Sequence, residues 1–162
     1  MGAVIYSLAD SKFGLGAAPR GTYHGLEMNA GHAPFVSLTG ADIERLADSL
    51  ERKPGAHGIV ASNDLPFTVR AISEQSVRAE EFEIHEFRDH VVQVLAGETT
   101  FAVGGEAENP RTAGLGEQLA LDVKGSSSVT MKKGDLLAIP RRTPHKRTTS
   151  GKVVMLMISV NH

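Results

Sequence analysis

Two histidines and a carboxylate stand directly before an alternating valine run in the segment EIHEFRDHVVQVLAG, residues 83–97. Imidazole and carboxylate groups are common ligands of divalent metals, so the segment suggests a metal site. A zinc-protease helix places its two histidines four residues apart, on one face. His85 and His90 are five residues apart, which a helix of about 3.6 residues per turn would separate by about 140°. The β-branched residues that follow favour a strand, so the pair is predicted to lie on β-structure.

The local pattern also predicts which of these side chains share a face. In a strand, residues two apart point to the same side, so Glu83 and His85 face the same way. His90 is predicted to begin the next strand after a tight turn at EFRD, with Val92 on its face. If that face lines the interior of a barrel, three ligands converge from one hairpin. Glu86 is an alternative to His85, because a different register of the turn would bring it inward instead.

The composition limits the chemistry of any such site. The chain of 162 residues has no cysteine, which excludes disulfides, thiolate nucleophiles and cysteine-ligated metals. A metal would have to be held by imidazole and carboxylate. The net charge of -2 argues against a nucleic-acid or anionic-membrane surface, and the absence of tryptophan argues against stacking of single-stranded nucleic acid.

The sequence contains no membrane or export signal that we can identify. No apolar run approaches the roughly 20 residues that span a bilayer. The first residues lack the basic region that begins a secretory signal. We therefore expect a cytoplasmic protein without a nucleic-acid or membrane partner.

The elements that would position the site fall into two parts. Residues 1–56 are predicted to form a Gly- and Ala-rich N-terminal arm followed by an amphipathic helix at about 41–53, where apolar residues recur at i, i+3, i+4 and i+7. Residues 57–162 alternate short apolar runs with Gly, Asp and Pro turn signals, which is typical of an all-β sandwich or barrel. A polar loop at 104–117 could border the opening of a site.

A third histidine lies in a second segment, GDLLAIPRRTPHKRTT, residues 134–149. This segment resembles the second motif of the cupin superfamily, G-x5-P-x-G-x2-H-x3-N. Gly134, Pro140 and His145 match the motif. Arg142 stands where glycine is usual, and Thr149 stands where asparagine is usual.

The first cupin motif, G-x5-H-x-H-x(3,4)-E-x6-G, is matched in spacing with glutamate and histidine exchanged. Alignment on Gly97 places His90 in the glutamate position and Glu83 in the first histidine position, while Val77 stands where a glycine leads the motif. The resemblance covers roughly residues 57–160. It implies a double-stranded β-helix, or jelly-roll, barrel of the RmlC-like type with four metal ligands: Glu83, His85, His90 and His145.

Three neutral imidazoles and a carboxylate suit a divalent transition metal such as Fe, Mn, Ni, Zn or Cu. The resemblance implies a small metal-binding cupin that binds or transforms a small organic molecule in its barrel. Metal-dependent dioxygenases and isomerases are the enzyme classes to consider, with Glu83 as a ligand or, if uncoordinated, as a general base. Two alternatives stay open: a non-enzymatic ligand-binding or sensing module, and a barrel that keeps its histidines only as polar packing.

Apolar surfaces outside the site also need a cover. The stripe of the predicted helix must be buried on the outer face of the barrel or against a second subunit. The final strand, VVMLMISV at 153–160, is apolar on both faces. A dimer or an N-terminal segment packed across the barrel would cover it, and we expect a homodimer. Histidines without motif context are predicted to be surface or chain-end residues: His24, His32, His57 and His162.

Overall fold

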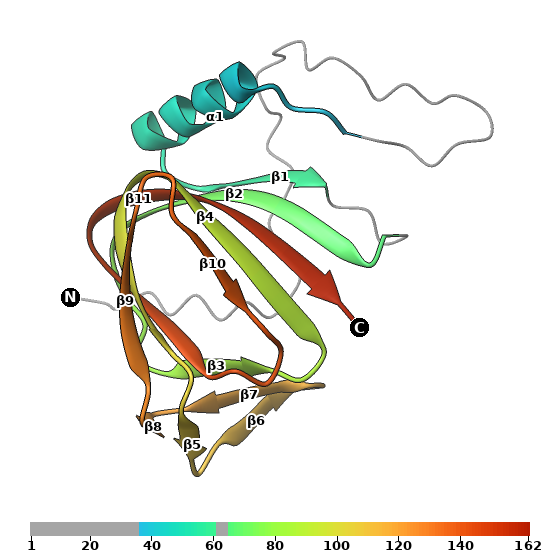
Figure 1. The fold of residues 1–162 in the computed structure, drawn as a ribbon, viewed down its shortest axis with the longest axis vertical. Coiled ribbons are helices and arrows are strands. Elements are labelled where there is room, and N and C mark those ends of the chain that lie inside the picture. The colour runs from blue at the N-terminus through green and yellow to red at the C-terminus, as the bar shows by residue number, and fades with distance from the viewer. Residues whose placement is uncertain (1–35, 61–64) are drawn as a thin grey trace. The chain divides into compact units, whose positions relative to one another are not determined.

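The computed structural model describes residues 36–60 and 65–162 (Figure 1). Residues 1–35 of the predicted N-terminal arm, including His24 and His32, lie outside the described residues. Residues Thr39–His162 form one compact unit, with one helix and eleven strands in its described part. The helix is not long and apolar enough to cross a bilayer.

Helix α1 (Gly40–Arg52) lies close to the range predicted from the apolar spacing. The hydroxyl of Thr39 accepts a hydrogen bond from the backbone N–H of Asp42, and the Asp42 carboxylate accepts one from the backbone N–H of Thr39. This reciprocal capping satisfies amide groups that the first turn of a helix leaves unpaired. The helix therefore begins where its sequence supplies the cap.

The apolar stripe of α1 covers the outer face of the strands. Leu46, Ala47 and Leu50 are buried, and they form one cluster with Ala71 and Val154 from two neighbouring strands. This is one of the two places of burial that the sequence allowed. The stripe is thus covered within the chain, and the homodimer stays a prediction.

The strands pair antiparallel, and most of them are short. In the described residues they form a nine-stranded sheet, with the order β1-β2-β11-β3-β7-β6 and with β4 joined to β9, β10 and β11, and a separate pair of β5 and β8. Their bounds are β1 (Ala56–Val60), β2 (Phe67–Arg78), β3 (Phe82–His85), β4 (Arg88–Val103), β5 (Glu106–Glu108), β6 (Arg111–Gly114), β7 (Glu117–Ala120), β8 (Asp122–Lys124), β9 (Ser127–Lys132), β10 (Leu136–Ile139) and β11 (His145–Asn161).

The two longest strands, β4 and β11, pair with each other along most of their lengths. Arg88 lies opposite Asn161 at one end of this ladder, and Val103 lies opposite His145 at the other. The pairing shifts register near the middle, and Figure 1 shows both strands sweeping round in the same place. The ladder therefore folds back on itself and encloses an interior.

Apolar side chains line most of that interior. Val92 and Val94 are fully buried in it and, as the alternation predicts, lie on the same face of β4 as His90. Leu95, on the opposite face, packs under α1. The interior cluster of buried residues consists of Val92, Val94, Phe101, Met131, Ile139, Val153 and Met155.

Gly97 occupies the middle of the bend. Its φ of 73° lies in the left-handed region, which side chains with a Cβ disfavour. A Cβ at this position would also collide with the backbone carbonyl oxygen of Lys152 on β11. Two strands can approach and turn here because residue 97 has no side chain.

We expect Gly97→Ala to lower the free energy of unfolding by about 3 kcal/mol, because it adds both a left-handed alanine and a backbone collision. The urea midpoint of the variant measures this loss. Gly151→Ala is the matched control, since it lies in the same bend with open space around its Cα and without a positive φ. Equal midpoints for the two variants would contradict the role given to Gly97.

Candidate metal centre

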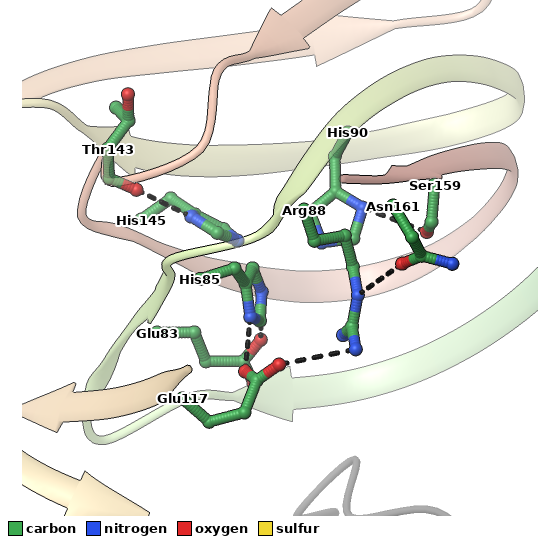
Figure 2. A network of polar contacts seen from close by, with 9 residues as sticks. All are labelled: Glu83, His85, Arg88, His90, Glu117, Thr143, His145, Ser159 and Asn161. Atoms are coloured by element: carbon green, nitrogen blue, oxygen red, sulfur yellow. Dashed lines mark hydrogen bonds and ion pairs between the residues drawn. The ribbon is translucent and has the colours of Figure 1, made fainter. Parts of the chain in front are cut away.

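The three histidines predicted as metal ligands come together in the interior (Figure 2). His85 ends β3, His90 lies in β4 and His145 begins β11. Their ring centroids are 4.9 Å apart for His85 and His90, 5.2 Å for His85 and His145, and 5.6 Å for His90 and His145. One ring nitrogen of each lies within 4.8 Å of one nitrogen of both others. Three nitrogens this close could hold one metal ion.

All three rings are removed from solvent. The relative exposures of His85, His90 and His145 are 4%, 7% and 8%. His90 and His145 lie towards opposite ends of the β4–β11 ladder, so their approach depends on the fold-back of that ladder. His85 joins them because Glu83, two residues before it on β3, pairs in register with His145.

The connection between β3 and β4 differs from the prediction. The sequence predicts a turn over EFRD, whereas β4 already begins at Arg88 and only Glu86 and Phe87 separate the two strands. Arg88 is paired with Asn161 of β11. The predicted hairpin is wrong as well, because β3 and β4 do not pair with each other and each pairs with β11. The start of β4 is thus fixed by a strand far away in the sequence.

Each imidazole is held by its Nδ1 atom. Nδ1 of His85 bonds to the carboxylate of Glu117 on β7, Nδ1 of His90 lies 2.9 Å from the hydroxyl of Ser159, and Nδ1 of His145 lies 2.9 Å from the carbonyl oxygen of Thr143. Partners of this kind fix the orientation of a ring and, where they accept a hydrogen bond, keep the proton on Nδ1. The Nε2 atoms are then left for the interior.

One ring nitrogen of His85, the fully buried Nε2 atom, lacks a hydrogen-bond partner in the described part of the chain. A buried polar atom without a partner costs free energy, and such atoms are rare in folded proteins. The rings of His90 and His145 lie beside the His85 ring, and Figure 2 shows the carboxylates of Glu83 and Glu117 on its other side.

Glu83 lies beside the three histidines. Its Oε2 atom is 3.6 Å from His85 Nε2, which is too long for a hydrogen bond but within the range of an ion pair. The side chain is 33% exposed, so it borders both the centre and solvent. Glu83 and His85 share a face, as the strand alternation predicts. The group of close ligand atoms consists of the histidines, and coordination by Glu83 stays a prediction.

Glu86, the alternative to His85, faces away from the centre. Its carboxylate accepts a hydrogen bond of 2.8 Å from Nε of Arg142 and forms an ion pair with the same guanidinium. The arginine lowers the pKa of Glu86. The register of the turn therefore places His85 inward and Glu86 outward.

Arg142 explains one departure from the cupin motif. It stands where glycine is usual, and it adopts the left-handed backbone conformation that glycine favours, with a φ of 65°. Its backbone N–H donates to the carbonyl oxygen of His85 over 2.7 Å. The arginine thus keeps the backbone conformation of the motif, and its side chain pairs with the β3–β4 turn.

The surroundings affect the three imidazoles differently. Burial, together with the neighbouring histidines, lowers the pKa of His90 to about 3. Burial also lowers the pKa of His145. Burial alone would lower the pKa of His85, but the carboxylates of Glu83 and Glu117 outweigh it and hold that pKa above its ordinary value. Two of the rings are therefore neutral, as metal ligation requires.

Glu83 is kept ionised by the same neighbours. Burial alone would raise the pKa of its carboxyl, but His85, His145 and Arg147 outweigh burial and lower it. The centre therefore combines neutral imidazole nitrogens with one carboxylate that carries its charge.

The residues that hold the rings could not be predicted from the sequence. Glu117 ends the polar loop that was considered as the border of a site, but nothing in the sequence connects it with His85. Ser159 lies in an apolar strand and meets His90 through the ladder register. Arg88, predicted in the turn, donates from Nε to Asn161 over 3.3 Å and forms an ion pair with Glu117 over 3.2 Å.

The remaining histidines of the described residues do not join the centre. His57 lies in β1 and pairs in register with Ala71 of β2, which packs under α1. His162 at the chain end forms an ion pair with Asp89. His162 is thus a partly exposed chain-end residue, as predicted.

Comparisons with known proteins give structural likeness without close relatives. No family model matches the chain, and no curated protein matches its sequence. The BH2720 protein from Bacillus halodurans has 18% sequence identity and a TM-score of 0.54, and the match covers 83% of this chain and 86% of that one.

Two further solved structures are cupins by name. A cupin superfamily protein from Desulfitobacterium hafniense has 16% identity, a TM-score of 0.47, and coverage of 68% of this chain and 79% of its own. A cupin-2 domain containing protein from Shewanella frigidimarina has 15% identity, a TM-score of 0.47, and coverage of 72% and 92%. At these identities the likeness concerns the fold, so activity has to be argued from the site.

We expect Ser159→Ala to weaken binding of a divalent metal about tenfold, because the His90 ring loses the partner of its Nδ1 atom. Titration of the metal-free protein with Zn²⁺ in a calorimeter measures the affinity. Ser73→Ala is the matched control, since the Ser73 hydroxyl is equally buried but has no hydrogen-bond partner in the described residues. A loss of affinity in both variants, or in neither, would contradict the holding role of Ser159.

Without metal, the histidines should titrate in a fixed order. As the pH falls, His85 should take up a proton before an ordinary histidine does, because its pKa is raised, while His90 should stay neutral below pH 5, because its pKa is lowered to about 3. NMR spectra of the imidazole protons at a series of pH values follow each ring, and the protein unfolded in urea is the control in which the order disappears. A folded protein in which both rings titrate together would disprove this order.

Proposed function

We propose that this chain is a small metal-binding cupin that holds a divalent transition metal through His85, His90 and His145 in order to bind or transform a small organic molecule in the barrel. One observation carries the proposal: His85 Nε2 is buried without a hydrogen-bond partner among the described residues, although a carboxylate of Glu83 lies 3.6 Å away and two further imidazoles lie beside the ring. A metal ion would satisfy this nitrogen.

The donor set fits such an ion. Three imidazole nitrogens, with Glu83 next to them, suit Fe, Mn, Ni, Zn or Cu. The Nδ1 partners fit as well, because metal-binding histidines usually donate their second ring nitrogen to a carboxylate, a carbonyl or a polar side chain. When bound, the metal would supply a Lewis acid or an oxygen-activating centre.

The chain's own residues define what a small molecule would meet there. Glu83 is ionised and partly exposed at the edge of the centre. It can complete the metal site or, if uncoordinated, accept a proton from a bound molecule. Both roles agree with a metal-dependent dioxygenase or isomerase, which are the enzyme classes that we propose. The alternative is a protein that binds a small molecule without catalysis. The identity of the bound metal would help to distinguish the two functions.

The experiment is elemental analysis of freshly purified protein by inductively coupled plasma mass spectrometry. We expect one transition metal in near-stoichiometric amount, and its loss in the variant with His85, His90 and His145 all changed to alanine, because that variant has no imidazole left in the centre. His145→Ala alone should also lower the metal content, since it removes the ligand that β11 supplies.

The control is His57→Ala, which removes a histidine outside the centre and should keep the full metal content. Far-ultraviolet circular dichroism shows whether each variant is folded. Wild-type protein that holds no metal, even after reconstitution, would disprove the proposal. Iron or manganese would direct the search to oxygenase reactions.

A further inference from the structure

Strand β2 turns one face towards the interior that holds the histidines. Ile72 lies in register with Met155, and Glu74 with Val153, and both of these β11 residues belong to the interior cluster. Paired residues of an antiparallel ladder project to the same side. Arg70, two residues before Ile72, therefore also projects to the interior, where its partner in the ladder is Met157.

The other two interior arginines of this region are neutralised. Arg147 pairs with Glu74 and lies over the ring of Phe101, which belongs to the interior cluster. Arg88 pairs with Glu117. In each case a guanidinium that is partly removed from water has a carboxylate at close distance, as such a charge requires.

Arg70 is different. The side chain is half-buried, and among the described residues none forms a hydrogen bond or an ion pair with its guanidinium. Holding a cation away from part of its water without a counter-charge is unfavourable. A planar guanidinium presents paired N–H donors that match the two oxygens of a carboxylate. This position is therefore prepared for an anionic group that the described residues do not provide.

The distance to the histidines sets the size of the molecule. Met157, opposite Arg70, is followed two residues later by Ser159, which contacts His90. Arg70 and His90 are thus two strands and two residues apart, which places their Cα atoms about 12 Å apart at about 4.8 Å per strand and about 3.3 Å per residue. The register places both residues on the interior side of the strands, so a molecule a few carbon atoms long has the length to reach from one to the other.

We propose that Arg70 binds the carboxylate of the small organic molecule, whose other end reaches the metal held by the three histidines. The substrate class is then a small carboxylic acid with a second oxygen or nitrogen donor a few bonds away. This assignment rests on the proposed function for the metal end. A single arginine favours a carboxylate over a phosphate group, whose second charge would need a further cation.

The test measures binding of malonate, succinate and glutarate by isothermal titration calorimetry, with the corresponding diamides as neutral analogues. Protein as purified and protein loaded with Zn²⁺ are compared. We expect at least one dicarboxylate to bind and its diamide not to. Arg70→Gln should weaken that binding by about tenfold or more, which is the usual effect of losing a charged hydrogen-bond partner, and Arg70→Lys should restore part of it.

Arg78→Gln is the matched control, because Arg78 lies on the same strand but is exposed. It should bind the dicarboxylate like the wild type. Elemental analysis of Arg70→Gln should show unchanged metal content, which separates this inference from the proposed function. Full metal content together with dicarboxylate binding that ignores the Arg70 change would overturn the inference while the proposed function stands.

Two further outcomes are decisive. If the wild type binds no metal, the proposed function fails, and dependence of dicarboxylate binding on Arg70 still decides whether Arg70 holds the carboxylate. If inorganic phosphate competes at least as well as the best dicarboxylate, the assignment to a carboxylate is wrong.

Discussion

The structure depends on the fold-back of the β4–β11 ladder. Two strands that pair along most of their lengths would keep their ends far apart if they stayed straight. The ladder turns instead at Gly97, where the backbone is left-handed and the carbonyl of Lys152 fills the space of a side chain. Because of this turn, His90 near one end and His145 at the other come within reach of one ion. The enclosed interior and the position of β3 follow from the same bend.

The polar groups of the interior are almost all paired with groups of opposite charge or with hydrogen-bond partners. Most of its lining is apolar, so each polar group needs a partner, and the chain supplies one for nearly all of them. The rings have their Nδ1 partners, Arg88 has Glu117, and Arg147 has Glu74. Among the described residues, the two interior groups left over are His85 Nε2 on β3 and the Arg70 guanidinium on β2, and they differ in kind. One accepts a cation and the other an anion, which is the arrangement expected around a bound molecule that meets a metal.

The sequence predicted the parts of this picture that depend on local pattern. Alternation put His90, Val92 and Val94 on one face, and the apolar spacing located α1 to within a residue at each end. The resemblance to the cupin motifs implied the fold and identified His145 as a third histidine ligand. The positions of Ser159, Glu117 and Arg70 could not be predicted in the same way, because each acquires its role from the register between strands that are distant in the sequence. The turn between β3 and β4 differed for the same reason, since β11 decides where β4 begins.

The origin of the three ligands has a consequence for folding. His85 and His90 lie on β3 and β4, which follow each other in the sequence but pair with β11 and not with each other, and His145 begins β11 itself. Pairing of segments so far apart carries a large loop-closure entropy and is a slow step. A partly folded chain therefore offers an ion at most two imidazoles, and tight coordination becomes available only when the last strand is in place. The metal would then bind after the barrel has folded and would stabilise the folded state, and it would not nucleate folding.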